Sequence, residues 1–237
     1  MDGARPDPEL PLQDPSRRTR VLITGAYGLI GNLVSARLAS RPNAYDVYGL
    51  VKNSDPSRRA ELIERYEIPA GQLRLADVSD FAAVRQAVEA MEVVVHLAAD
   101  PDGKAEWASV LHNNIIGARN VFEACRLARV KRVIYASKVF GEALAHMYAD
   151  THGLSCICLR IGWVVPDDRL PHPYAQSLWC SQRDIVQLIE RCINAPDSLR
   201  FDIFFGQSNN RHNLVDIQHA VDVLGYAPQD RAEDRLA

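Results

Sequence analysis

The fold of this chain is decided by the stretch Val21-Leu22-Ile23-Thr24-Gly25-Ala26-Tyr27-Gly28-Leu29-Ile30-Gly31. Residues 21–24 predict a buried strand, and the apolar spacing after Gly28 predicts a helix. Gly25 allows a tight turn, Gly28 lets a ligand approach the backbone, and Gly31 lets the helix pack close to the sheet.

A strand, a glycine-rich turn and a helix in this order are typical of a site for a dinucleotide pyrophosphate, whose charge lies at the positive end of the helix. The sequence therefore predicts that NAD or NADP is bound by Gly25, Tyr27, Gly28, Leu29, Ile30 and Gly31. The alternative is a simple strand-to-helix turn.

The composition limits the other functions of the chain. Its 237 residues are 47% hydrophobic, which is enough for one core with a small annex. A net charge of -3 with scattered Lys and Arg gives no face for nucleic acid, and no apolar run is long enough to cross a membrane. The five cysteines form no C-x-x-C pair and the histidines lack ligand spacing, so we expect reduced thiols, a cytoplasmic location and no metal site.

Short apolar runs alternate with stretches of helical periodicity. Strands are expected at 21–24, 45–51, 73–76, 93–97, 132–136, 154–161 and 201–205. Helices are expected at 29–39, 80–90, 105–128, 139–151, 181–194 and 214–225, with a short surface helix at 56–66. This alternation predicts an α/β fold with a doubly wound, Rossmann-type parallel sheet.

The chain divides into three parts. Residues 1–18 are rich in proline and charge and predict a disordered leader. Residues 19–162 predict the nucleotide-binding core. Residues 163–237 predict a small substrate-side annex that completes the same domain.

Further residues fall beyond the carboxyl ends of the strands, where ligands bind in open parallel sheets. Asp77 is placed to accept a hydrogen bond from the adenine amino group and Val78 to pack on its ring; the alternative is that Asp77 caps the helix near Asp80. After the fourth strand, the small side chains of a Leu97-Ala98-Ala99 segment leave room for ribose and pyrophosphate. His96 is expected to be a packed strand-end histidine rather than a catalyst.

The end of the second strand bears on the choice of cofactor. An acid there would bond the ribose 2′-hydroxyl and repel a 2′-phosphate, but this chain has Lys52, with Arg58 and Arg59 beyond it. Lys52 predicts that NADP binds at least as well as NAD. The alternative is that these bases form a solvated face.

These features resemble the extended short-chain dehydrogenase/reductases of the NAD-dependent epimerase/dehydratase family. The resemblance rests on T-G-x-x-G-x-x-G at 24–31, D-V at 77–78, H-L-A-A at 96–99, the helix at 113–124, the strand at 132–137 and the S-K-V-F-G-E segment at 137–142. The uronate dehydrogenase subgroup is the most similar. The resemblance implies a sugar or uronate as substrate and NAD or NADP as cofactor; self-association into a homo-oligomer is left open.

The resemblance also shows what is missing. The family uses a Tyr-x-x-x-Lys pair, whose lysine lowers the tyrosine pKa so that the phenolate accepts the substrate proton. Lys138 matches the lysine, but Ile134 stands four residues earlier, and Tyr135 lies on the strand. In the relatives a segment of roughly thirty residues separates strand from lysine, whereas strand-to-helix loops usually have about two to six residues and this joint has almost none. Either the segment is deleted or the protein has lost catalysis.

The remaining catalytic roles follow from the resemblance. Ser137 corresponds to the serine that bonds the substrate hydroxyl, or to the one that precedes the lysine. Asn114 would support Lys138 through a water, or bond the helix backbone instead. Arg160 and Trp179 are placed to line the substrate cleft, or Arg160 pairs with a surface carboxylate. The chain is thus expected to be an NAD(P)-dependent sugar or uronate oxidoreductase or epimerase, impaired as written; the alternative is a non-catalytic NAD(P)-binding sensor.

Overall fold

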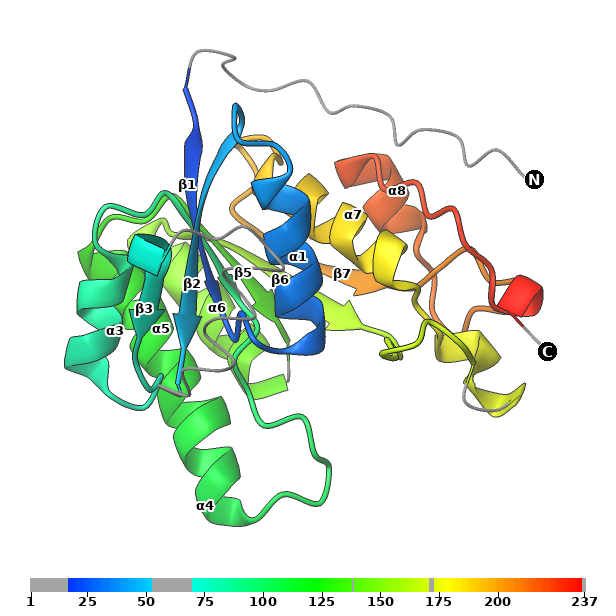
Figure 1. Cartoon of the computed structure of the whole chain (residues 1–237), viewed down its shortest axis with the longest axis horizontal. Coiled ribbons are helices and arrows are strands. Elements are labelled where there is room, and N and C mark those ends of the chain that lie inside the picture. The colour runs from blue at the N-terminus through cyan, green and yellow to red at the C-terminus, as the bar shows by residue number, and fades with distance from the viewer. Residues whose placement is uncertain (1–16, 53–69, 138, 171–172, 236–237) are drawn as a thin grey trace.

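The structure is a computed structural model that describes residues 17–52, 70–137, 139–170 and 173–235 (Figure 1). Its centre is one sheet of seven parallel strands in the order β3-β2-β1-β4-β5-β6-β7. The chain runs outward from β1 to β3 and then crosses back to β4, which confirms the predicted doubly wound sheet. The strands are β1 (Thr19–Thr24), β2 (Tyr45–Val51), β3 (Leu73–Leu75), β4 (Val93–His96), β5 (Arg132–Ala136), β6 (Ser155–Ile161) and β7 (Phe201–Gly206).

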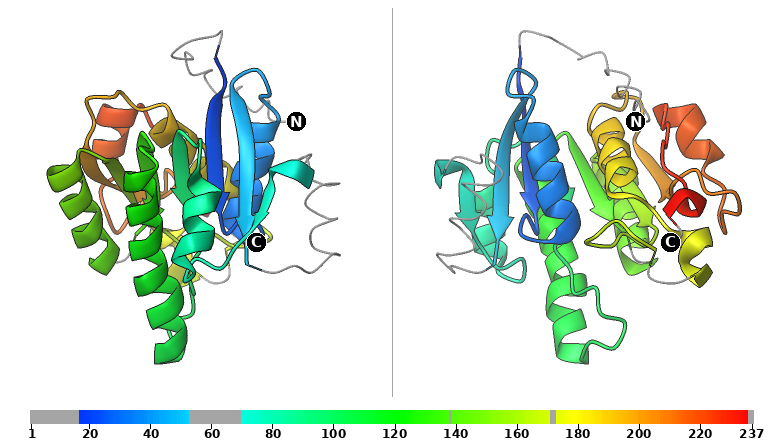
Figure 2. Two further views of the ribbon diagram at one scale, coloured as in Figure 1. Left: turned by 90° about the vertical axis from the view of Figure 1, so that its left-hand side faces the viewer. Right: turned by 45° about the vertical axis from the view of Figure 1, so that its right-hand side comes forward.

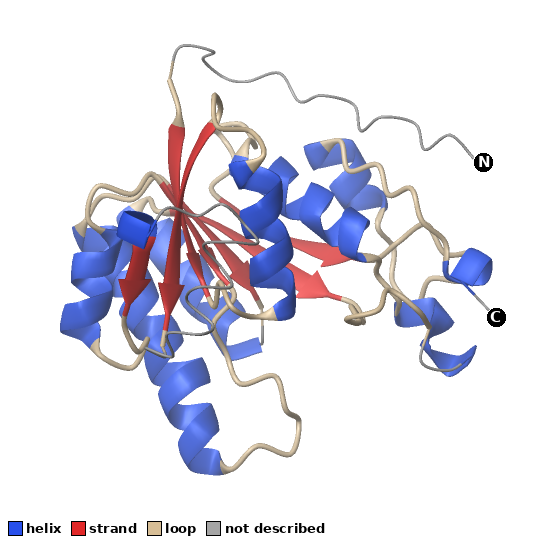
Figure 3. Cartoon of the chain, in the orientation of Figure 1, coloured by secondary structure: helices blue, strands red, loops and turns tan. Residues whose placement is uncertain are grey.

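Helices cover both faces of the sheet (Figures 2 and 3). One face carries α1 (Leu29–Ala39), α7 (Gln182–Ile193) and α8 (Gln218–Leu224), and the other carries α3 (Phe81–Val88), α5 (Gly117–Leu127) and α6 (Val139–His152). Shorter elements are α4 (Trp107–Ser109), the π-helix η2 (Val110–Ile116), and the 3₁₀ turns η1 (Ala70–Gln72), η3 (Pro173–Leu178) and η4 (Ala232–Arg235). None of the described helices is long and apolar enough to cross a lipid bilayer.

Alternation along the strands divides the core between the two helical layers. In β1, Val21 and Ile23 belong to the cluster under α1 and α7, whereas Leu22 belongs to the cluster under α3 and α5. Both sets are fully buried, which is why the strands read as continuous apolar runs rather than alternating ones. All five cysteines are also buried.

The observed elements differ from the predicted ones mainly at their ends. The last helix begins at Gln218 rather than at 214, because the Asp216 carboxylate accepts the Gln218 N–H at 2.8 Å. The predicted surface helix at 56–66 and residues 1–16 of the predicted leader lie outside the described residues. Arg17 is described, and its Nη2 lies 2.6 Å from Glu92 Oε1.

A buried arginine ties the sheet to the end of α7. Arg132 at the start of β5 is 1% exposed, and its guanidinium donates to the Ser155 hydroxyl at 2.9 Å. It also donates to the last carbonyls of α7 and the turn after it, at Cys192, Ile193, Ala195 and Pro196. The Cys192 carbonyl also accepts the Ala195 N–H at 3.3 Å, and the Pro196 carbonyl accepts the Leu199 N–H at 3.0 Å. Arg132 thus adds a buried donor at the helix end that lies against the sheet, where the regular helical bonds stop.

Replacing this arginine should destabilise the whole fold. We expect Arg132→Leu to lower the free energy of unfolding by about 3–5 kcal/mol, because the Ser155 hydroxyl and several carbonyls lose a buried charged donor at once. Urea denaturation followed by circular dichroism measures the change. The control Arg85→Leu, at an exposed position on α3, should change it by no more than about 0.5 kcal/mol. Equal losses in the two variants would show that the Arg132 bonds contribute nothing specific.

Candidate functional site

The glycine turn between β1 and α1 is a place of unusually close backbone contact. Gly25 has a φ of +70°, and a Cβ there would lie 2.9 Å from the Ala98 nitrogen at the end of β4. A Cβ on Gly31 would lie 2.2 Å from the Gly25 carbonyl oxygen. Only glycine at 25 therefore permits the tight turn, and only glycine at 31 permits the close packing of α1, as the sequence predicts.

Thr24 fixes β4 beside this turn. Its hydroxyl oxygen accepts the Leu97 N–H at 3.2 Å and the Ala98 N–H at 3.1 Å, and it is hydrogen-bonded to His96 Nδ1 at 2.7 Å. His96 is 1% exposed, so it packs at the strand end as predicted. The ends of β1 and β4 are thereby held together where the strand order reverses, which is where ligands bind in open α/β sheets.

The N-terminus of α1 is free to bind an anion. Among the described residues, no side chain caps this helix at Gly28, and its first turn holds no acid. By contrast, the Asp80 side chain caps α3 and the Ser181 side chain caps α7. The first backbone N–H groups of α1, at the positive end of the helix dipole, are therefore available to an anion.

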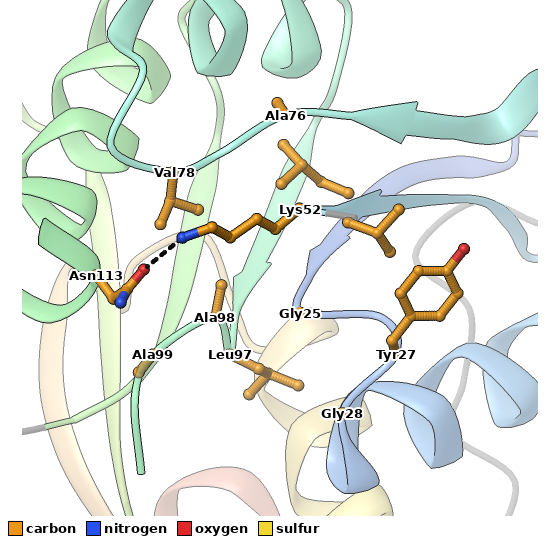
Figure 4. A pocket seen from close by; sticks show the side chains of 12 residues that line it. Gly25, Tyr27, Gly28, Lys52, Ala76, Val78, Leu97, Ala98, Ala99 and Asn113 are labelled. Atoms are coloured by element: carbon orange, nitrogen blue, oxygen red, sulfur yellow. Dashed lines mark hydrogen bonds between the residues drawn. The ribbon is translucent and has the colours of Figure 1, made fainter. Parts of the chain in front are cut away.

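A cavity of about 320 Å³ lies on the β2 and β3 side of this turn (Figure 4). Lys52 extends across it from the end of β2 toward Asn113 on η2, with 3.4 Å between Nζ and Oδ1. Sequence reasoning missed Asn113 and chose its neighbour Asn114 instead. The lining residues are Gly25, Tyr27, Gly28, Leu50, Val51, Lys52, Ala76, Val78, Leu97, Ala98, Ala99 and Asn113.

Asp77 lies beside this cavity with its carboxylate already engaged. One oxygen accepts from the Ser79 N–H at 2.9 Å and the Ser79 hydroxyl at 2.8 Å, and the other lies 2.9 Å from Lys52 Nζ. Burial raises the pKa of Asp77, but the Ser79 and Lys52 contacts outweigh it, so the pKa is lowered and the carboxylate stays charged. The alternative that Asp77 caps α3 is wrong, because Asp80 does so by accepting the Ala83 N–H.

A second cavity, of about 740 Å³, continues from the same turn along the ends of β5 and β6. It shares Gly25, Gly28, Leu97 and Ala99 with the first cavity. The remaining lining residues are Leu29, Ile30, Gly31, Pro101, Ala136, Ser137, Leu159, Ile161, Gly162, Trp163 and Val164. The two cavities thus adjoin at the glycine turn, beside the N-terminus of α1.

Ser137 enters the second cavity but is bonded on its other side. Its hydroxyl donates to Glu142 Oε1 at 2.8 Å, and Glu142 accepts from Arg160 Nε and Nη2, each at 2.7 Å. The two bonds from Arg160 lower the pKa of Glu142 despite burial. Arg160 thus pairs with a carboxylate, as one alternative predicted, although Glu142 is only 8% exposed rather than on the surface.

Tyr135 and Trp179 line neither of the two cavities. Tyr135 packs in the core against His96 and Phe122, with ring centroids 5.4 and 5.6 Å apart, and burial raises its pKa to about 12. Trp179 is fully buried, so the prediction that it lines the cleft is wrong. Trp163 lines the cleft instead, and its position after the sixth strand was the available signal.

The Asn114 side chain is hydrogen-bonded to the loop that follows β4. Its side chain accepts the Asp100 N–H at 2.7 Å and donates to the Asp100 carbonyl at 3.1 Å, so the bonds go to this loop and not to its own helix. Lys138 lies outside the described residues, and the relay between the two residues stays a prediction. Among the described residues, no group of three or more His, Cys, Asp and Glu is arranged to hold a metal ion.

The chain is similar to known proteins in sequence and in fold. Residues 21–137 match the model of the NAD dependent epimerase/dehydratase family. The NAD-dependent glucose-6-phosphate dehydrogenase of Haloferax volcanii is 30% identical, over 90% of this chain and 94% of that protein. That alignment spans 257 positions, more than the 237 residues of this chain, so it contains residues of the relative that have no counterpart here.

Uronate dehydrogenases are also similar. The enzyme of Pseudomonas putida is 30% identical, over 90% of this chain and 85% of that protein. A crystal structure of a tyrosine-to-alanine mutant of the Agrobacterium tumefaciens uronate dehydrogenase, complexed with NAD, is 28% identical, with a TM-score of 0.77 over 92% of this chain and 87% of that one. The chain therefore belongs to the NAD-dependent epimerase/dehydratase family.

Proposed function

We propose that this chain binds a nicotinamide dinucleotide across its two joined cavities and belongs functionally with the sugar and uronate oxidoreductases, with low turnover as written. The observation that carries the proposal is the uncapped N-terminus of α1, which lies where the cavities meet. A pyrophosphate there would lie on free N–H groups, with one nucleotide half in each cavity.

The first cavity suits the adenosine half. Val78 is 5% exposed and packs against Gly117, where a Cβ would lie 2.7 Å from a Val78 methyl group, so its side chain is fixed as an apolar wall for the adenine. Lys52 Nζ lies 2.9 Å from Asp77 Oδ2, and we propose that the ribose hydroxyls lie beside this pair. A 2′-phosphate would accept from Lys52 but would face the Asp77 carboxylate, and the balance of the two decides between NADP and NAD.

The second cavity suits the nicotinamide and the substrate. The relatives named above act on glucose 6-phosphate and uronates, and we propose a sugar or uronate for this chain too. In such an oxidation, hydride leaves a sugar carbon for the nicotinamide and the hydroxyl proton must go to a base. Ser137 is placed at the substrate end, but its hydrogen is donated to Glu142, so it offers the substrate an acceptor oxygen.

None of the described residues of this site is a suitable proton acceptor. Tyr135 is buried with a raised pKa, and none of the described residues that line the second cavity is a tyrosine. The Glu142 carboxylate is held by Arg160 and has a lowered pKa, which makes it a poor base. The lack of a suitable base among the described residues of the second cavity also favours a second candidate, a non-catalytic NAD(P)-binding sensor. The uronate dehydrogenase mutant, in which one tyrosine is replaced by alanine, still forms a complex with NAD, which supports this candidate.

The first test concerns the glycine turn. Gly28→Val places a branched side chain where the pyrophosphate should lie, so we expect the NAD affinity in calorimetry to fall at least about tenfold, or about 1.4 kcal/mol. The control is Gly103→Val, because a Cβ at Gly103 meets nothing within 4 Å. If Gly28→Val binds NAD as tightly as the control, the cofactor lies elsewhere.

The second test concerns cofactor choice. Lys52→Ala should lower the ratio of NADP to NAD affinity by about three- to tenfold, because an exposed ammonium contributes modestly to binding a phosphate. Asp77→Asn should shift the ratio the opposite way, because it removes the charge that opposes the phosphate. Fluorescence titration with both cofactors measures the ratio. A ratio that neither substitution moves would mean that the pair is only surface charge.

The third test concerns catalysis. We expect the chain as written to bind NAD but to reduce it with uronate or glucose about a hundred- to ten-thousandfold more slowly than a version repaired with a tyrosine segment, because a positioned general base typically contributes this much. The repair inserts a segment ending in Tyr-Gly-Val and a serine between Ser137 and Lys138. The repaired chain with Lys138→Met is the control and should be slow again. Comparable turnover with and without the repair would show that another base acts here.

A further inference from the structure

Trp163 stands at the rim of the second cavity, directly after β6. It exposes 43% of its surface, whereas Trp179, its partner in an isolated parallel β-bridge, is fully buried. Trp107, on α4, is also exposed but lines neither cavity. Exposed large apolar side chains are common singly, but one that lines a cavity marks a binding surface.

The backbone of Trp163 is held on both sides. Its N–H donates to the Leu178 carbonyl at 2.7 Å, and its carbonyl accepts the Cys180 N–H at 3.1 Å. The preceding Gly162 donates to the Gly206 carbonyl at 2.8 Å, and a Cβ on Gly162 would lie 2.2 Å from the Leu178 oxygen. The segment at 177–180 is thus packed against the end of β6, and the backbone of Trp163 is held at the cavity.

We propose that Trp163 is the platform on which the ring of the sugar substrate packs. This inference rests on the proposed function and names how the same site recognises its substrate. One face of a pyranose ring carries C–H groups and is apolar, whereas its rim carries hydroxyls. An aromatic side chain binds the C–H face with little loss of conformational freedom.

The other walls of the cavity fit this arrangement. Ile161, Val164 and Pro101 supply apolar surface, and Ser137 on the neighbouring strand end supplies an acceptor for a sugar hydroxyl. A mainly apolar cavity with a few placed polar groups is the usual design of a small-molecule site. Because the platform contacts the C–H face, it should bind neutral and acidic sugars alike.

The experiment measures sugar binding without turnover. Protein saturated with NADH is titrated with glucose and with glucuronate in a calorimeter, since reduced cofactor cannot accept hydride. Trp163→Ala should weaken the affinity for both sugars about tenfold, and Trp163→Phe should retain most of it, within about threefold, because an aromatic face remains. Trp107→Ala is the matched control and should bind both sugars like the unaltered chain.

The outcomes separate this inference from the proposed function. NADH affinity should be unchanged in all three variants, and circular dichroism should show the same folded state. Loss of NADH affinity in Trp163→Ala with intact sugar affinity would overturn the inference, as would equal sugar binding by Trp163→Ala and the control, or NADH-loaded protein that binds neither sugar. Failure of the unaltered chain to bind either NADH or NAD would instead overturn the proposed function.

Discussion

The structure depends on the contact between three backbone segments at the glycine turn. Gly31 of α1 lies against the Gly25 carbonyl, Gly25 lies against the Ala98 nitrogen, and at neither glycine is there room for a Cβ. This close packing brings the helix N-terminus to the point where strand order reverses between β1 and β4, and it leaves the first N–H groups of α1 uncapped. From this point the strands are added in opposite directions, toward β3 on one side and toward β7 on the other. A cavity therefore lies on each side of it.

The two cavities differ in the polar groups that line them. At the first cavity, Lys52, Asp77 and Asn113 form a connected polar set and Val78 an apolar wall. At the second cavity, β5 ends at Ala136 and α6 begins at Val139, so only residues 137 and 138 join them. The Ser137 N–H donates to the Leu159 carbonyl at 2.8 Å and its hydroxyl donates to Glu142, whose lowered pKa makes it a poor base.

The sequence predicted the elements well because strands buried on both faces, such as β4 with Val93, Val94 and Val95, leave an unambiguous apolar run. It also predicted the glycine turn, because positions that have no room for a Cβ must be glycine, and glycine is read directly from the sequence. It assigned Trp179 rather than Trp163 to the cleft, because the sequence does not show how the segment at 177–180 packs on β6, and this packing buries Trp179. Nor could it show that Asp77 engages Lys52, a contact between the ends of two strands that depends on their register.

Hydrogen–deuterium exchange with and without NAD tests whether the cofactor lies on the N-terminus of α1, between the two cavities. NAD should slow exchange of the backbone amides at 25–32 and at 97–99, because the pyrophosphate would accept from the former and the nucleotide would cover the latter. Exchange in α8, which lines neither cavity, should stay the same. Saturating NAD that leaves 25–32 unprotected, or that protects α8 instead, would show that the cofactor binds elsewhere.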